Sequence, residues 1–393
     1  MICPVCGQKS QHRKCPQCGF DSSLHYEKYP TLAPVKNAAT AAALRKEWEN
    51  KRKPSNKWLW LALTAVAAVL LLCMGLGLGG GTDGPEETSP TIAVENDGRW
   101  KENILRSDDP PPIMCTEIII SYVVEHSVFG SEYQRQQIET VTFLDTLENR
   151  PENAWDVSAA GDGTVQAWVT PNGEMYDLYI AAEGGINGKE ACRGLFAGYR
   201  NLKKIHNLDL LHTEEALDMR RMFIWCLALT DLDVSSFQTA NVQDMGCMFY
   251  CCEAVTELNL KNFDTSNVQD MNNMFSCCEM LQTLNVSSFD TSKVENMAWM
   301  FFNCASLTDL DVSSFRTSAV QNMGNMFGSC ESLRSLDLRS FDTSNVQNMN
   351  GMFSFCEGLT NLDLSSFDTG AVEDTTRMFY DCPAGADWQH LLK

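Results

Sequence analysis

A repeat with a strict 26-residue step is the feature that most constrains how this 393-residue chain can fold. The pair Met-Phe occurs seven times at that step, and a degenerate unit around Leu195 brings the total to about eight, the last one truncated. The methionines of these pairs are Met222, Met248, Met274, Met300, Met326, Met352 and Met378. A unit of this length cannot bury its apolar side chains alone, so successive units stack and share one core. The step therefore predicts a solenoid over residues 192–393.

Each unit has two halves with different periodicities. Leu284 and Val286 alternate with polar neighbours, which is typical of one face of a short strand. The other half has the helical spacing i, i+3, i+4, i+7, with apolar side chains at Met271, Met274, Phe275 and Cys278. Ser266 and Gln269 precede this stripe as a candidate capping box, and equivalent pairs occur in other units. We therefore predict one strand and one short helix per unit, which is an α/β leucine-rich-repeat geometry.

The complete consensus of the unit allows a family to be named. The pattern LxxLDVSSFDTSxVxxMxxMFxxC, almost whole at Leu307–Cys330 and Leu333–Cys356, resembles that of the BspA-like leucine-rich repeat surface proteins of bacteria. The segments 154–158, 165–169 and 176–180 resemble the region that precedes those repeats, so the resemblance covers roughly residues 115–382. It implies display at the cell surface and adhesion to host or neighbouring-cell proteins, without identifying a ligand.

The region before the repeats is expected to be a small β domain. Residues 115–124 and 138–144 are apolar and β-branched enough to form strands, and 155–180 continues the pattern. A solenoid needs its first coil shielded from water. We therefore predict a β-rich cap over residues 115–191.

A membrane helix is predicted further towards the N-terminus. Residues 58–78 contain no charged side chain, and 21 residues are just long enough to cross a hydrocarbon layer of about 30 Å. The preceding segment 21–57 is basic, whereas the Gly- and Pro-rich linker 79–114 is acidic. The positive-inside rule then places the N-terminus in the cytoplasm and the repeats outside the cell. Because the C-terminus carries no sorting signal of the kind found in cell-wall-anchored relatives, we expect this helix to be the anchor.

Two cysteine knuckles open the chain. The sequences CPVCG and CPQCG supply four thiolates within residues 1–20: Cys3, Cys6, Cys15 and Cys18. Four thiolates at this spacing predict a closed tetrahedral site for a structural Zn²⁺, with iron as the chemical alternative. This region resembles the zinc-ribbon heads that precede the membrane helix in many bacterial membrane proteins.

Charge differs sharply between the two sides of the predicted membrane helix. Residues 1–57 carry 11 basic and 4 acidic side chains, whereas residues 81–393 carry 19 basic and 47 acidic ones. The acidic part would repel a phosphate backbone. We therefore exclude nucleic acid as a partner of the repeat domain.

Thirteen cysteines remain, and nine of them fall into two groups. Seven of them follow the repeat step from Cys226 to Cys382 and lie in the apolar stripe, where packing is favoured over metal or redox chemistry. Cys251 and Cys277 lie outside that stripe and are 26 residues apart. Because stacking would bring them close together, we predict that they form a disulfide.

Acidic residues recur beside the predicted strands. Asp233, Asp311, Asp337 and Asp363 would form a row along one face of the sheet. Such a row is a candidate face for calcium or a cationic ligand. The alternative is a solvated or Asx-stacked face that keeps an exported solenoid soluble.

No nucleophile-base pair, HExxH, P-loop or dinucleotide fingerprint occurs, so we do not expect an enzyme. We expect a single-pass surface protein whose extracellular solenoid binds a macromolecule, most simply another protein. The alternative is a transmembrane signalling or scaffold protein whose zinc ribbon recruits a cytoplasmic partner. A third possibility is a structural role in the cell envelope without a specific ligand.

Overall fold

The computed structural model describes residues 98–108, 127–189 and 191–392. All of them belong to one compact unit of the chain. The predicted zinc ribbon, basic segment and membrane helix, residues 1–78, lie outside the described residues, as does the predicted strand 115–124. Within the described ranges, no helix is long and apolar enough to cross a membrane.

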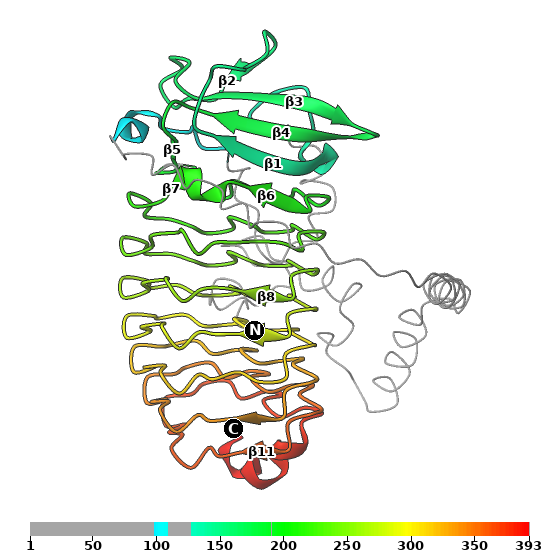
Figure 1. Cartoon of the computed structure of the whole chain (residues 1–393). Helices are drawn as coiled ribbons and strands as arrows, with labels where there is room; N and C mark the ends of the chain where they lie inside the picture. The colour runs from blue at the N-terminus through cyan, green and yellow to red at the C-terminus, as the bar shows by residue number, and fades with distance from the viewer. Residues whose placement is uncertain (1–97, 109–126, 190, 393) are drawn as a thin grey trace, which may run out of the picture. The chain divides into compact units, whose positions relative to one another are not determined.

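A β sheet lies at the N-terminal end of the repeats (Figure 1). Its strand order is β2-β3-β4-β1-β6. The bounds are β1 Ile138–Leu144, β2 Trp155–Asp156, β3 Gln166–Asn172, β4 Met175–Ala181 and β6 Lys204–His206. The strand expected at 138–144 is therefore present, and 155–180 contains three strands. One face of the sheet buries the apolar side chains of β1, β3 and β4 at 0–7% exposure, namely Val141, Phe143, Ala167, Val169, Leu178 and Ile180.

The same sheet continues into the repeats. Strand β6 belongs to the first coil, and it pairs in parallel with β1 through Thr140–Thr142. On the other edge of β6, Lys204 forms a parallel bridge with Asp231 of the next coil. The cap therefore covers the first coil by supplying it with a neighbouring strand.

Short 3-10 helices and a buried ion pair fix the segments around the cap. The 3-10 helices before the repeats are η2 Arg99–Glu102 and η4 Arg135–Gln137, and η5 Leu208–Leu210 lies in the first coil. The guanidinium of Arg135, 1% exposed, lies 2.8 Å from the carboxylate of Asp108. Arg135 also donates to the carbonyl of Ala197 in the first coil at 2.6 Å. This contact ties the segment before the cap to the repeats.

Short parallel strands mark one side of the coils (Figure 1). Their bounds are β8 Glu257–Leu258, β9 Thr283–Leu284, β10 Ser335–Leu336 and β11 Asn361–Leu362. Strands β5 Ile186–Asn187 and β7 Leu211–His212 pair with each other in a separate two-stranded sheet. In the paired strands β8–β9 and β10–β11, equivalent residues of adjacent units face one another, such as Leu258 with Leu284 and Leu336 with Leu362. The 26-residue step is thus the register of the stack.

The predicted helix of each unit is wrong, because the described residues contain no α-helix. The Met-Phe half of each coil consists of turns in which some amides donate to carbonyls of the next coil and others donate within the same coil. Phe223 N–H donates to the Met248 carbonyl at 2.8 Å, whereas the Cys226 amide donates within the coil to the Phe223 carbonyl at 3.2 Å. The carbonyls of the next coil thus accept amide hydrogens that an α-helix would pair with its own carbonyls. The stripe is nevertheless buried as predicted, because the turns keep a spacing of three to four residues.

The capping boxes are absent for the same reason. The Ser266 amide donates to the Asp264 carboxylate at 3.0 Å. The Gln269 amide donates to the Gln243 carbonyl of the preceding coil at 2.8 Å. Neither residue caps a helix. Both hold a corner of the coil.

Columns of identical side chains fill the core between coils. The phenylalanine rings of the Met-Phe pairs form a column from Phe223 to Phe379. Each ring stacks on the equivalent ring of the next coil, with centroids 5.6–5.8 Å apart and planes nearly parallel. A column of buried threonines links the coils through hydrogen bonds, as where Thr265 Oγ1 donates to the Asp290 carbonyl at 2.9 Å. The core is therefore continuous along the stack.

Candidate functional site

The strand side of the stack presents a continuous polar surface, here named the strand face. In each coil one buried leucine, such as Leu310, lies between two exposed polar residues, such as Asp309 and Asp311. The exposed residues of the face are Asp231, Asp233, Glu257, Asn259, Thr283, Asn285, Asp309, Asp311, Ser335, Asp337, Asn361 and Asp363. Because backbone pairing sets the spacing between coils, this surface is held rigidly.

The four aspartates predicted as a ligand face all lie on this surface, and each holds a turn. The amide of the residue two positions later donates to the carboxylate, at 2.9 Å for Asp233 and Asp311, 3.2 Å for Asp337 and 3.0 Å for Asp363. Hydrogen bonds from the side chain and from the amide of that residue lower the pKa of all four carboxyls. The pKa of Asp337 falls to about 2 because the Arg339 side chain also donates to it. This geometry is that of aspartates holding local turns, while one lone pair or more of each carboxylate still faces solvent.

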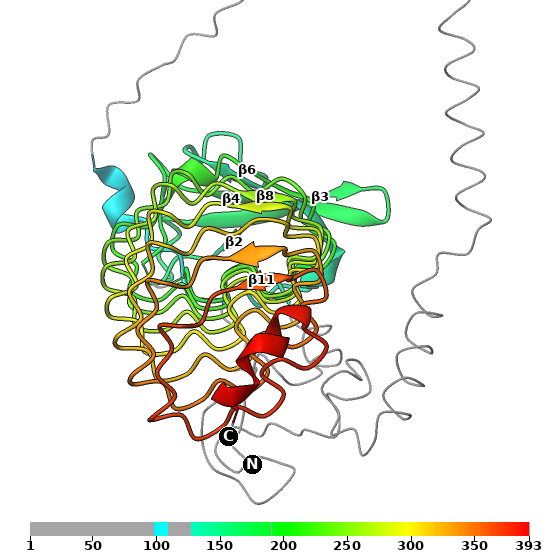
Figure 2. The same cartoon turned by 90° about the horizontal axis from the view of Figure 1, so that it is seen from below.

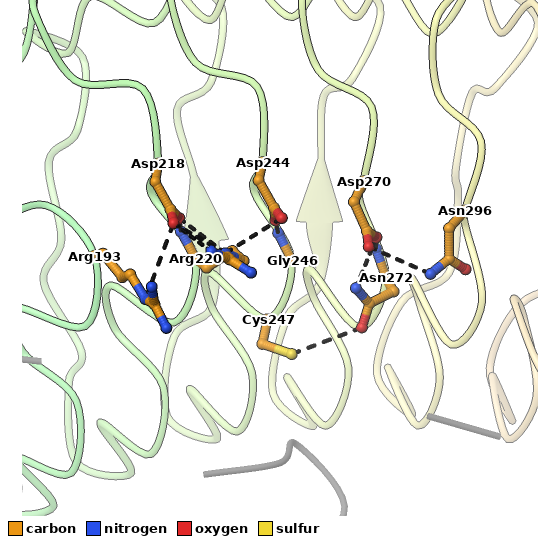
Figure 3. A network of polar contacts seen from close by, with 9 residues as sticks. All are labelled: Arg193, Asp218, Arg220, Asp244, Gly246, Cys247, Asp270, Asn272 and Asn296. Carbon is orange, nitrogen blue, oxygen red and sulfur yellow. Dashed lines mark hydrogen bonds and ion pairs between the residues drawn. The ribbon is translucent and has the colours of Figure 1, made fainter. Parts of the chain in front are cut away.

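A second polar surface lies on another side of the coils, here named the Asx groove (Figure 3). It has a volume of about 440 Å³. Its lining is Leu217, Asp218, Arg220, Gln243, Asp244, Gln269, Asp270, Glu295 and Asn296. Exposed glutamine and glutamate side chains form its rim, and half-buried Asp and Asn form its floor. The floor residues of adjacent coils are joined by isolated parallel bridges.

Two arginines neutralise part of the Asx groove, and Arg193 lies 3.9 Å from Asp218. Arg220 lies 2.6 Å from Asp218 and 3.2 Å from Asp244 (Figure 3). Burial and, after it, the negative charge of Asp270 raise the pKa of Asp244 to about 7, although the Gly246 amide and Arg220 act to lower it. Burial also raises the pKa of Asp270, against the donors from Asn272 and Asn296. This groove therefore contains a carboxyl group that changes charge near neutral pH.

The Asx groove and the threonine column were not predicted from the sequence. A signal was present, because an Asp or Asn stands four residues before every Met-Phe pair, from Asp218 to Asp374. Its role depends on folding, since each of these side chains accepts the amide two residues later, as Asn322 does from Gly324 at 3.0 Å. The spacing of these Asp and Asn residues in the sequence does not distinguish a corner of a coil from an ordinary loop.

The seven cysteines that follow the repeat step are packed in the core, as predicted. The thiols from Cys226 to Cys356 donate to carbonyls of the preceding coil, for example Cys304 to Phe275 at 3.2 Å and Cys356 to Phe327 at 3.0 Å. Burial raises the pKa of Cys330 to about 12, so this thiol is neutral at physiological pH. A protonated, buried thiol is a poor nucleophile and metal ligand.

The predicted disulfide between Cys251 and Cys277 is not formed. Both thiols are buried, at 0% and 2% exposure. The residues lie at equivalent positions of stacked coils with the same left-handed backbone, φ +58° and +61°. Side chains at equivalent positions run side by side, whereas a disulfide requires the two Cβ–Sγ bonds to converge.

The predicted metal ligands Cys3, Cys6, Cys15 and Cys18 lie outside the described residues. Among residues 98–108, 127–189 and 191–392, no group of three or more His, Cys, Asp or Glu side chains is arranged to hold a metal ion. The row of Asp233, Asp311, Asp337 and Asp363 is thus not gathered into such a group.

Comparisons with known proteins point to a repeat family. The family described as "Mycoplasma protein of unknown function, DUF285" matches residues 190–307 and 278–387. Among solved structures, a leucine-rich repeat protein from Bacteroides ovatus ATCC 8483 is 13% identical, with 55% of this chain and 71% of that chain covered and a TM-score of 0.18. No curated protein matches the chain.

Proposed function

Because the chain belongs to the DUF285 repeat family, a BspA-like repeat family, we propose that its repeat domain is a protein-interaction module. The observation that carries this proposal is the strand face. It is a continuous, exposed and polar surface on a rigid stack of coils. Such surfaces make many small contacts with an extended or flat partner, and rigidity reduces the entropy lost on binding.

The role is binding rather than catalysis. The four aspartates of the strand face are ionised and already hold turns. The buried thiols are protonated. None of these groups is poised to transfer a proton or attack a substrate.

A site-specific crosslinking experiment tests the proposal on intact cells. A photo-crosslinking amino acid replaces Asp311 on the strand face of the full chain, and the matched control places it at Gln321, which is exposed on the side of the Asx groove rim. We expect a discrete crosslinked protein from the Asp311 position alone. Equal adducts at both positions, or adducts at neither, would contradict binding through the strand face.

We further propose that residues 58–78 anchor the protein in the membrane with the repeats outside the cell. The uncharged run and the basic segment before it support this topology. Protease treatment of intact cells should release peptides from 192–393 but none from 21–57. Release of neither set would reject the extracellular location.

A second candidate function rests on the paired CPxCG knuckles. If the four cysteines bind Zn²⁺ in the cytoplasm, the ribbon could recruit a partner there and make the chain a transmembrane signalling or scaffold protein. Full-length protein with Cys3→Ser and Cys6→Ser should then lose a stoichiometric equivalent of zinc and its cytoplasmic partner together. Loss of zinc with the partner retained would leave the ribbon a purely structural role.

A further inference from the structure

Residues 383–391 follow the last described coil and do not continue the repeat, yet the core side chains of that coil are nearly as buried as those of the interior coils. Leu359 is 0% exposed, like its equivalents Leu307 and Leu333. Phe379, the last ring of the stack, is 7% exposed, against 0% for Phe353. Something other than a coil must therefore cover this end.

The covering element is the 3-10 helix η6, Pro383–Leu391 (Figure 2). Its Ala384 and Leu391 are buried, and the ring of Trp388 packs against the core of the last coil. Proline at its start removes an amide that would otherwise lack an acceptor. The helix thus closes the core with sequence that does not follow the repeat.

The helix also occupies the backbone edge on which a further coil would pair. Strand β11 pairs with β10 on one edge only. At its other edge, the indole Nε1–H of Trp388 donates to the Leu362 carbonyl at 2.9 Å. The Ala384 amide donates to the Leu359 carbonyl at 3.1 Å. Both donors belong to η6, so this helix, rather than a further coil, bonds to these carbonyls of the last coil.

The fit of this helix depends on a glycine. A Cβ atom on Gly385 would lie 2.3 Å from Cβ and 2.5 Å from Cγ of Phe379, which no side-chain adjustment of Gly385 itself could relieve. Only glycine allows η6 to approach the last ring of the stack so closely. The contact is therefore sensitive to a single added methyl group.

We propose that Pro383–Leu391 is an edge-blocking cap, and that displacing it exposes the β11 edge as an interface for the same edge of a second copy of this chain. An open strand edge with an apolar core behind it is a template for another strand. At the opposite end the edge of the first coil is already paired, because β1 pairs with β6, and the cap sheet ends at the two-residue strand β2. Two uncapped C-terminal ends would therefore meet, and the product is a closed dimer rather than a fibre.

The test compares full-length variants in one detergent by light scattering coupled to size-exclusion chromatography. Trp388→Ala removes both the ring and the donor, Trp388→Phe removes mainly the donor, and Gly385→Ala lifts the helix. Leu392→Ala is the matched control, because that side chain is 38% exposed just beyond the helix. We expect the protein mass of Trp388→Ala and Gly385→Ala to rise towards twice the wild-type value with concentration, and Leu392→Ala to match wild type.

A second variant shows whether association uses the β11 edge. Asn361→Lys places a charge on β11, and combined with Trp388→Ala it should return the mass to the wild-type value. A double variant that still associates would overturn the proposed interface. Where Trp388→Ala unfolds, the two milder variants decide. The proposal fails if Trp388→Phe and Gly385→Ala keep the circular dichroism spectrum of the wild type and also its mass at all concentrations.

Discussion

Asp244 occupies a position at which three other coils carry asparagine, Asn296, Asn322 and Asn348. Either side chain can accept the amide two residues later, and Asp244 does so from Gly246 at 2.9 Å. The difference is charge. A carboxylate here is half-buried beside Asp270, so its ionisation is opposed by lost solvation and by a like charge. The same corner is therefore neutral in some coils and titratable in others.

Asp244→Asn should stabilise the repeat domain at neutral and higher pH. The pKa of Asp244 is raised from 3.8 to about 7, so the folded state holds a proton that the unfolded state releases between these values. Wild-type stability relative to the variant is thus highest below pH 4 and declines as the pH rises to 7. We expect a gain on the order of 1 kcal/mol at pH 8 and little at pH 4, measured by denaturant unfolding.

The matched control is Asp233→Asn. Its carboxyl has a lowered pKa because of the Ser235 donors, so the sign of the effect is reversed. The wild-type advantage should be present above about pH 4, the unfolded pKa, and disappear on acidification. An Asp244→Asn variant that behaves like this control would contradict the burial argument.

At the scale of the element, the Met-Phe segment shows how a helical pattern can be used by a different structure. Two residues flank each pair with left-handed backbone, as Trp299 at φ +63° and Asn303 at φ +57° do around Phe301. A right-handed helix cannot pass through such residues. Asparagine or glycine, the residues that favour this backbone, fills only four of the fourteen flanking positions: Asn273, Asn303, Asn325 and Gly351. The sequence signal against a helix was therefore weak.

Substitutions at Asn303 distinguish the two structures. Both Asn303→Ala and Asn303→Gly lose the hydrogen bond to Glu279, so their difference reports the backbone alone. In the left-handed turn, glycine should be more stable than alanine by about 1 kcal/mol. In a helix the order would be reversed by a similar amount. Chemical denaturation of both variants decides the sign.

At the scale of the whole molecule, the repeat domain is a stack in which each coil contacts its neighbours. The Phe, Thr and Cys columns all join one coil to the next. Sequence outside the repeat covers both ends, β1 at the first coil and η6 at the last. Stability in such a stack is approximately a sum of coil and interface contributions, and the terminal coils have fewer neighbours.

Hydrogen exchange should therefore form a gradient along the stack. The amides of Phe275 and Phe301, which donate to the next coil, should exchange most slowly. The amides of Ala384 and Gly385 in the C-terminal helix should exchange faster, because opening there disrupts only one interface. Mass spectrometry of peptic fragments measures this. Uniform protection from first coil to last would indicate a single cooperative unit instead.

The sequence by itself determined the step of the stack, the buried face of each coil and the strands 138–144 and 155–180. These follow from which side chains are apolar and how they are spaced, and that is a local property. Only the tertiary structure decided the turns in place of helices, the thiol-to-carbonyl bonds of the cysteine column and the unformed bond between Cys251 and Cys277. It also decided the Asx groove and the closure of the last coil. The turns and the thiol bonds depend on partners in a neighbouring coil, which lie 25 residues away for the Phe275 amide and 29 residues away for the Cys304 thiol. Local spacing does not reveal partners so distant in the sequence.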